Sequence, residues 1–274
     1  MSIIFNSELK NEDFITISSE CEGLNFGFGI FESIKIHKGS LLFFNEHIQR
    51  LRSSCGQVGM AWNRNSENIR KSAELIIEAD GLKEGKLKII YFKNKTQNDL
   101  LITASDKVYP ENKYKKGISV MLSSMKKNPD SILCRIKSLN HLENSLAKED
   151  ANNKGFDEAL FLNTDNYLCE GSASNVFWIK DRCIYTPSGK CGLLPGIIRK
   201  LVPEIAKEVG IPFIEGEYEM SDILSAEEVF MTNSIMGIMP VGNIQSTKYH
   251  VDTECITHKL LRTYNEIVNN IIES

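Results

Sequence analysis

The sequence has no apolar run near the roughly 18 residues that a helix needs to cross a bilayer. Its start, MSIIFNSELKNED, turns polar after three apolar residues, so we expect no signal peptide. The seven cysteines are an odd number and include no Cys-x-x-Cys pair. Reduced thiols in a cytoplasmic protein are therefore expected, rather than a disulfide framework.

Neither sign of charge is in large excess, because the sequence has 32 lysines and arginines, 36 acidic residues and a net charge of −4. This balance gives no electrostatic reason to expect nucleic acid or an anionic membrane as a partner. Any bound anion must then be held by a local site. The five histidines show no pair suited to zinc on one helical face, so no metal site is expected.

Hydrophobic periodicity predicts an α+β protein with two lobes. We expect a small N-terminal lobe over 1–118, a linker over 119–130 and a larger C-terminal lobe over 131–274, because the stretch 107–130 mixes charge, asparagine and two prolines. Apolar residues at helical spacing predict helices at 46–55, 66–80, 139–155, 194–210 and 253–272. Short apolar runs between turn residues predict strands at 34–36, 41–44, 87–92, 100–104, 118–122, 158–162, 167–169, 175–179, 183–185, 211–215 and 228–232. The stripe expected to be buried in helix 139–155 is Leu139, Leu142, Leu146 and Ala147.

Two ionisable residues stand where a strand is expected to end. Lys137 lies between apolar residues, and a desolvated lysine can have a lowered pKa and act as an amine nucleophile. A solvated lysine at a helix start gives the same local pattern. Glu170 enters a turn of small residues, where a carboxylate can contact a cationic ring nitrogen or simply cap the turn.

Three segments have features of a phosphate site. Pro195 and Gly196 precede a long predicted helix, so free N–H groups and the helix dipole point at one spot. The segment 232–234, Thr-Asn-Ser, ends an apolar strand in hydroxyl residues, and Arg50 could add a positive charge. His47 is expected to be a structural side chain beside Arg50 rather than a base.

These segments together resemble the class IV aminotransferases, which are pyridoxal-phosphate enzymes of fold type IV. The resemblance covers nearly the whole chain and keeps the order of the family's motifs. The matching segments are FGFGIFES (26–33), NEHIQRL (45–51), IKSLN (136–140), DEAL (157–160), EGSASNVF (170–177), LPGIIR (194–199) and EVFMTNS (228–234).

The resemblance implies a two-lobed α+β fold with pyridoxal 5′-phosphate in the cleft between the lobes. It implies that Lys137 holds the cofactor as a Schiff base and moves the proton, while Glu170 pairs with the pyridine nitrogen. It assigns the phosphate to Arg50, the backbone N–H groups of Ile197 and Ile198, and Ser234. Ile198 stands where many relatives have threonine, so one side-chain hydrogen bond to the phosphate is expected to be missing. Relatives are usually homodimers that act on small amino substrates.

The resemblance is less specific about the reaction. Ser33 stands where lyases often carry threonine, and the segment 233–241 also resembles the 4-amino-4-deoxychorismate lyases, which form 4-aminobenzoate and pyruvate in folate synthesis. The alternative is a branched-chain or D-amino-acid aminotransferase using 2-oxoglutarate. In the D-amino-acid enzymes a tyrosine falls where Phe31 stands and an arginine falls near Lys93. Phe31, Ser33 and Lys93 are the residues expected near substrate, the lyase reaction is favoured, and a non-catalytic cofactor-binding protein is a remote third alternative.

Overall fold

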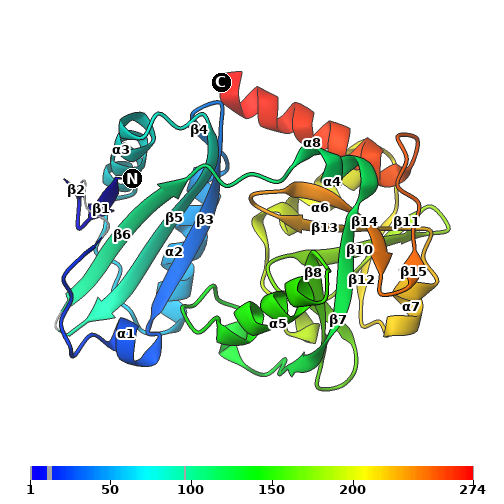
Figure 1. Ribbon diagram of the computed structural model, residues 1–274, viewed down its shortest axis with the longest axis horizontal. Helices are drawn as coiled ribbons and strands as arrows, with labels where there is room; N and C mark the ends of the chain where they lie inside the picture. Colours follow the sequence, from blue (N-terminus) through cyan, green and yellow to red (C-terminus); the bar gives the residue numbers. More distant parts are fainter. Residues whose placement is uncertain (1, 11–13, 96, 274) are drawn as a thin grey trace. The chain divides into compact units, whose positions relative to one another are not determined.

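The computed structural model describes residues 2–10, 14–95 and 97–273, and the chain divides into two compact units. Unit 1 comprises Met1–Val108, Ile136–Asn140 and Ile271–Ser274, and unit 2 comprises Tyr109–Arg135 and His141–Asn270. Each unit is built on its own β-sheet with helices beside it (Figure 1). The expected α+β class is confirmed.

Unit 1 contains a six-stranded antiparallel sheet in the order β2-β1-β6-β5-β3-β4. Its strands are β1 (Ile3–Phe5), β2 (Glu8–Lys10), β3 (Gly29–His37), β4 (Ser40–Leu41), β5 (Glu84–Asn94) and β6 (Gln97–Ser105). The three long strands β3, β5 and β6 lie side by side in Figure 1. The strands expected at 34–36, 87–92 and 100–104 are present and longer than expected.

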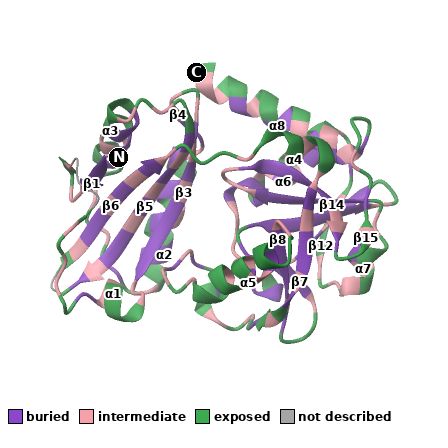
Figure 2. Ribbon diagram, viewed as in Figure 1, coloured by how far each residue is buried: buried purple, intermediate pink, exposed green. Residues whose placement is uncertain are grey.

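Helices α2 (Phe44–Gln57) and α3 (Ser66–Ala79) share one hydrophobic core with this sheet, and a short helix α1 (Glu22–Phe26) precedes β3. The apolar residues that predicted helix 66–80 are all buried: Ile69, Ala73, Ile76 and Ile77. Because side chains alternate along a strand, Ile30, Ile34 and Ile36 of β3 enter the core while Ser33 and Lys35 face the opposite side. Figure 2 shows the resulting run of buried residues along β3, β5 and β6.

Unit 2 contains a mixed nine-stranded sheet in the order β12-β11-β10-β13-β14-β7-β8-β9, with β15 paired to β14. The strands are β7 (Ile118–Lys127), β8 (Glu158–Asn163), β9 (Leu168–Gly171), β10 (Asn175–Lys180), β11 (Cys183–Pro187), β12 (Phe213–Gly216), β13 (Glu228–Asn233), β14 (Gly237–Ile244) and β15 (Thr247–Lys248). The helices are α4 (Glu111–Lys116), α5 (Leu142–Asn153), α6 (Ile197–Glu208), α7 (Met220–Leu224) and α8 (Ile256–Glu273), of which α8 passes into unit 1 at Ile271. Strands β9, β10 and β13 are buried almost throughout, which gives the residues at their ends a rigid base.

The structure differs from several sequence expectations. The strand expected at 41–44 is reduced to β4, Ser40–Leu41, because Phe44 already begins helix α2. The segment expected as a linker, 119–130, mostly belongs to β7, which lies between β14 and β8 inside the unit 2 sheet. The first half of β7 is apolar and mostly buried, and its two charged residues, Lys126 and Lys127, come only at the end of the strand. Helix α5 begins only at Leu142, and its buried residues are Ala147 and Ala151, whereas Leu142 is 71% exposed. The predicted stripe was therefore wrong except for Ala147, because small residues let this helix pack close to β7 and β8.

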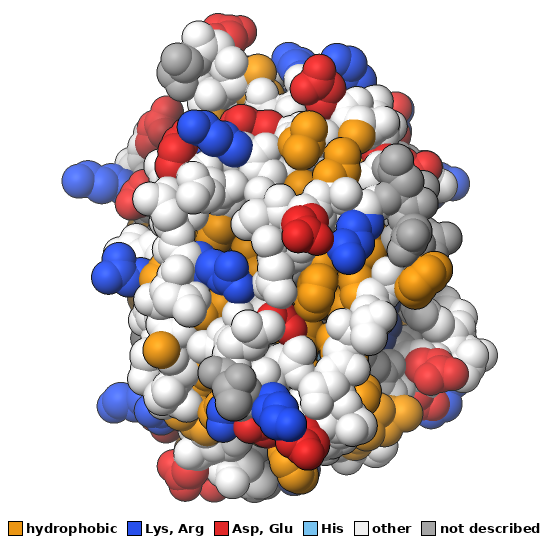
Figure 3. All heavy atoms as spheres, turned by 90° about the vertical axis from the view of Figure 1, so that its left-hand side faces the viewer, with side chains coloured by type: hydrophobic (Ala, Val, Ile, Leu, Met, Phe, Trp, Pro, Cys, Tyr) orange, Lys and Arg blue, Asp and Glu red, His pale blue; other side chains and the backbone are white. Residues whose placement is uncertain are grey.

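No described helix is long and apolar enough to span a bilayer. All seven cysteines are free and buried, as the lack of paired spacing indicated. On the face shown in Figure 3, basic and acidic side chains are interspersed with apolar ones. This mixture agrees with the near-balance of charge in the sequence.

Candidate active site

The segment that carries Lys137 is held against β3 by backbone hydrogen bonds. Phe31 N–H donates to the Lys137 carbonyl over 2.8 Å, and Leu139 N–H donates to the Gly29 carbonyl over 2.8 Å. Lys137 is therefore in an extended segment that adds to the unit 1 sheet, and it precedes helix α5 by several residues. Its half-buried side chain places Nζ 4.4 Å from the centroid of the Phe31 ring.

Arg50 lies in a buried charged cluster on the core side of β3. Glu32 is fully buried there, and its carboxylate accepts two hydrogen bonds from Arg50, from Nε (2.7 Å) and from Nη2 (2.6 Å). His47 lies one helical turn before Arg50 on α2, so both side chains reach the same carboxylate. Burial alone would raise the pKa of Glu32, but the Arg50 charge and the hydrogen bonds from Arg50 and His47 outweigh it and lower this pKa to about 2.

His47 is neutral in this cluster, because burial lowers its pKa and the nearby charges of Arg50 and Lys137 lower it further against the attraction of Glu32. The ionised Glu32 can only accept, so His47 Nδ1 carries the proton in their 2.7 Å hydrogen bond. The lone pair of His47 Nε2 is then buried, with no partner among the described residues. The expectation of a structural histidine beside Arg50 fits this geometry.

Phe31 and Ser33 of β3 lie on one face of the unit 1 sheet, and Lys93 of β5 lies on the other. Phe31 pairs with Ile90 and Ser33 pairs with Lys88 on β5, so the side chain of Lys88 shares their face. Lys88 Nζ lies 5.0 Å from the centroid of the Phe31 ring. Lys93 Nζ instead bonds to Glu22 Oε1 at 3.0 Å and lies over Phe28. The structure thus places Phe31 beside Lys137 and Ser33 on the same face of the sheet as Phe31, but leaves Lys93 on the other face.

In unit 2, Glu170 is nearly buried at the end of β9, with 7% of its surface exposed. Its Oε2 accepts a hydrogen bond from the Leu194 N–H over 2.9 Å. The following turn is fixed by Glu158 on β8, whose carboxylate accepts hydrogen bonds from the hydroxyls of Ser172 and Ser174. The Leu194 N–H therefore orients the buried Glu170 carboxylate, while the Glu158 bonds fix the turn that follows it.

Helix α6 begins with an anion-binding geometry. Gly196 precedes its first residue, Ile197, and no side chain of the described residues caps the helix, so the dipole and the first N–H groups can face an anion. A Cβ on Gly196 would come within 2.1 Å of Asn175 Oδ1, so only glycine lets the backbone approach this closely. Thr232 is the direct cross-strand neighbour of Asn175, and its buried Oγ1 has no partner among the described residues.

Ile197 and Ile198 occupy the first turn of α6, as expected, and both are buried. Ser234 follows β13, half exposed in a turn that Asn233 fixes by accepting hydrogen bonds from the N–H groups of Ile235 (2.9 Å) and Met236 (2.8 Å). Glu32 and Thr232 lie within the matching motifs, but the resemblance assigned neither of them a role of its own. The sequence pattern that could have identified Glu32 is a charged residue at a core position of an alternating strand, between Ile30 and Ile34.

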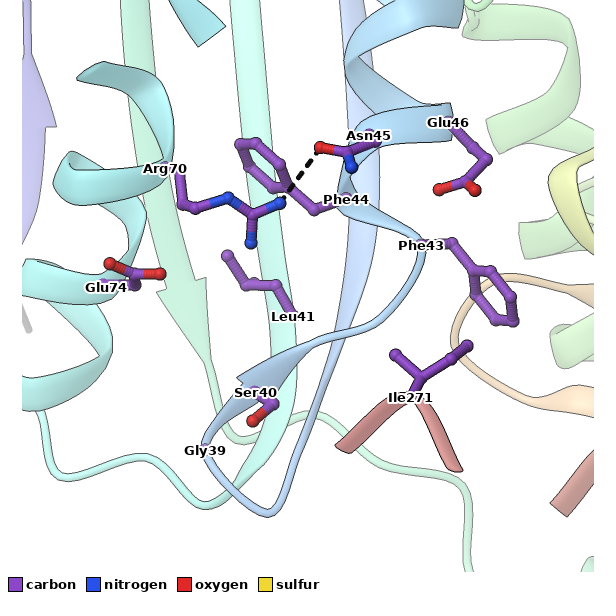
Figure 4. Close-up of a pocket in the computed structure, with 10 residues that line it drawn as sticks. All are labelled: Gly39, Ser40, Leu41, Phe43, Phe44, Asn45, Glu46, Arg70, Glu74 and Ile271. Carbon is purple, nitrogen blue, oxygen red and sulfur yellow. Dashed lines mark hydrogen bonds between the residues drawn. The ribbon is translucent and has the colours of Figure 1, made fainter. Parts of the chain in front are cut away.

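A pocket of about 410 Å³ in unit 1 includes none of these residues (Figure 4). It lies at the start of α2 and is lined by Gly39, Ser40, Leu41, Phe43, Phe44, Asn45, Glu46, Arg70, Glu74 and Ile271. Arg70 already donates to Asn45 Oδ1 over 3.0 Å and lies 4.2 Å from the centroid of the Phe44 ring. With Glu46 and Glu74 also present, this pocket is poorly suited to an anion such as phosphate.

We expect Gly196→Ala to lower the stability of the protein by about 1–3 kcal/mol, the usual cost of forcing extra atoms into a packed site. Asn175 cannot easily yield, because it is buried and its Nδ2 donates to the Leu194 carbonyl over 2.9 Å. Denaturant unfolding would measure the change. Gly189→Ala is the matched control in the same unit, since a Cβ there meets nothing within 4 Å. Equal stability of the two variants would contradict the close approach at Gly196.

Comparison with known proteins places this geometry in a family. Residues 29–244 match the family model "Amino-transferase class IV". The chain is 27% identical to the aminodeoxychorismate lyase of Bacillus subtilis, over 98% of this chain and 96% of that protein, and 27% identical to a D-alanine aminotransferase of Listeria monocytogenes, over 90% and 89%. The branched-chain amino acid aminotransferase of Escherichia coli has the same fold, with a TM-score of 0.90 at 23% identity over 97% of this chain and 94% of that one. The chain therefore belongs to the class IV aminotransferases, a family of pyridoxal-phosphate-dependent lyases and transaminases.

Proposed function

We propose that this chain is a 4-amino-4-deoxychorismate lyase, which releases pyruvate and leaves 4-aminobenzoate. The observation that carries the choice is the Ser33 hydroxyl, which shares a face of β3 with Phe31, the residue whose ring lies 4.4 Å from Lys137 Nζ. A hydroxyl on that face suits a reaction in which a leaving group must be protonated. The lyase relative, aligned over nearly the whole chain, supports the same reaction.

Each unit, taken by itself, carries donors and acceptors that fit one part of pyridoxal 5′-phosphate. Glu170 is a buried carboxylate that can accept a hydrogen bond from a protonated ring nitrogen. The uncapped start of α6 at Ile197 and Ile198, the Ser234 hydroxyl and the Arg50 guanidinium are groups that bind phosphate. Lys137 supplies the amine that would hold the cofactor. We infer a homodimer in the cytoplasm on the resemblance of the motifs.

The cofactor, when bound, supplies an electron sink that stabilises negative charge at the amine-bearing carbon. The Lys137 amine takes the proton from that carbon, and the neighbouring C–O bond to the three-carbon unit breaks. In this proposal the Ser33 hydroxyl relays the same proton from the Lys137 ammonium to the leaving enolate, which becomes pyruvate, so that both side chains return to their starting states. The ring keeps its amine and becomes aromatic, so the two products account for every atom of the substrate.

The reaction itself can be assayed directly. Purified protein saturated with pyridoxal phosphate should release pyruvate from aminodeoxychorismate, and it should turn over D-alanine or branched-chain amino acids with 2-oxoglutarate slowly or not at all. Transamination without pyruvate release would make the chain an aminotransferase. That second candidate is favoured by its D-alanine aminotransferase relatives. A protein that binds the cofactor and shows neither activity would be a cofactor-binding protein only.

Glu170→Gln should lower kcat by about 10²–10³, the usual cost of removing one aligned electrostatic stabiliser. Glutamine keeps the side-chain length and the acceptor for the Leu194 N–H, so the fold should be unchanged. It cannot hold the ring nitrogen in its protonated form, because its charge is gone. Steady-state pyruvate release would measure the loss, and the visible spectrum would show that cofactor is retained. Full activity in the variant would remove Glu170 from the mechanism.

A further inference from the structure

Three lysines lie next to one another on the face of the unit 1 sheet that carries Ser33. Lys35 of β3 is directly opposite Lys86 of β5, and Lys88 is two residues further along β5, opposite Ser33. The next strand, β6, places Ser105 beside Lys86 and Thr103 beside Lys88. The side chains of all three lysines are on one face and half buried.

These lysines have no direct counter-charge. Within the described residues, none of the three forms an ion pair with a carboxylate. Burial lowers the pKa of each lysine, and repulsion from Lys107 and Lys88 lowers the pKa of Lys86 further. Among the residues that the structure describes, only Glu84 acts in the other direction, by raising the pKa of Lys35.

Like charges directly opposite each other on paired strands destabilise a sheet. Electrostatic attraction therefore stabilises an anion more strongly at a partly desolvated cluster of this kind than at an ordinary surface. The hydroxyls of Ser33, Thr103 and Ser105 add neutral hydrogen-bond donors to the same face.

The cluster adjoins the reacting lysine. Lys88 Nζ lies 5.0 Å and Lys137 Nζ 4.4 Å from the centroid of the same Phe31 ring. A substrate whose amine reacts at Lys137 therefore has Lys88 as its neighbour along β3 and β5. The Lys35–Lys86 row follows two residues, or roughly 7 Å, beyond Lys88.

We propose that Lys35, Lys86 and Lys88 form a carboxylate-binding face that selects an amino substrate with a second carboxylate remote from its amine. This inference rests on the proposed lyase function for its substrate. Both products of that reaction, 4-aminobenzoate and pyruvate, carry a carboxylate, so the substrate carries two. A branched aliphatic side chain on this face would bury the ammonium groups without an anion, which is unfavourable.

Binding of unreactive probes tests the face without catalysis. Benzene-1,3-dicarboxylate should bind the cofactor-loaded parent protein about 10-fold or more tightly than benzoate, as one extra charge-assisted contact allows. Lys88→Met and Lys35→Met keep the apolar stem and remove the charge. Each variant should bring the ratio of the two affinities, dicarboxylate over benzoate, closer to one. Lys83→Met, which removes an exposed lysine just before β5, should leave the preference unchanged. Calorimetric titration would measure all four proteins.

Equal affinity of the parent for both probes, or an unchanged preference in both cluster variants, would overturn the proposal. If the variants do not fold, titration of the parent at increasing salt decides, because screening of a charge-based preference should make the two affinities converge. A preference that salt leaves unchanged would count against the lysines. The protein could also prefer the dicarboxylate and yet release no pyruvate from aminodeoxychorismate. That result would support the carboxylate-binding face and reject only the lyase function.

Discussion

Lys137→Ala should reduce pyruvate release by about 10³-fold or more. General acid–base catalysis alone is worth about 10²–10⁴ in rate, and this variant also loses the amine that would hold the cofactor. The fold should survive, because the segment is tied to β3 by the backbone bonds of Phe31 and Leu139 rather than by the lysine side chain. A visible absorption spectrum taken before and after borohydride would show whether a reducible cofactor–lysine bond is present in the parent and absent from the variant.

Lys200→Ala is a suitable control, because Lys200 is exposed on α6 and this variant also lacks one lysine. It should keep both the absorption band and the activity. A reducible band that persists in Lys137→Ala would place the cofactor on another lysine. If the cofactor-saturated parent shows no such band, the residue assignments made by resemblance lose their basis.

The helices of unit 1 show what periodicity can predict. Ile69, Ala73, Ile76 and Ile77 repeat at helical spacing, and α3 buries all four. The same reasoning gave helix α5 but selected the wrong face. Spacing shows that a helix has an apolar side, whereas the surface that covers it depends on distant strands, and β7 and β8 accept only the small residues Ala147 and Ala151.

For the candidate site too, the sequence predicted some residues correctly and could not predict where others lie. Motif order indicated Lys137, Arg50 and Glu170, but it did not give strand register, which decides the face on which a side chain lies. Lys93 was expected near substrate from its place in the sequence, yet it lies on the opposite side of β5 from Lys88. Only the pairing of β5 with β3 shows that Lys88 shares the face of Phe31.

Glu32→Gln should destabilise the protein by about 3–5 kcal/mol at neutral pH, the usual result of removing one partner of a buried ion pair. Glutamine has nearly the same shape, but it leaves the Arg50 guanidinium, only 10% exposed, without its opposite charge. It also removes the charged acceptor of the His47 Nδ1–H. Glu84→Gln is the matched control on the same sheet, because Glu84 is 46% exposed and an exposed pair is worth at most about 1 kcal/mol.

The pH dependence of stability gives an independent check on Glu32. Its pKa is about 2 in the folded protein against an ordinary value of 4.5, and a difference of one in pKa corresponds to about 1.4 kcal/mol. Because the folded pKa is the lower one, the ionised carboxylate contributes about 3 kcal/mol above pH 4.5, and this contribution is lost as the pH falls towards 2.

Urea unfolding at several pH values would therefore show the parent losing stability between pH 4.5 and 2 by more than Glu32→Gln does, and the two curves should approach each other at the acid end. Other carboxylates act alike in both proteins, so the difference between the curves isolates Glu32. Parallel curves would mean that Arg50 and His47 do not hold the carboxylate in its ionised form. Arg50 would then have no fixed position from which to bind a phosphate.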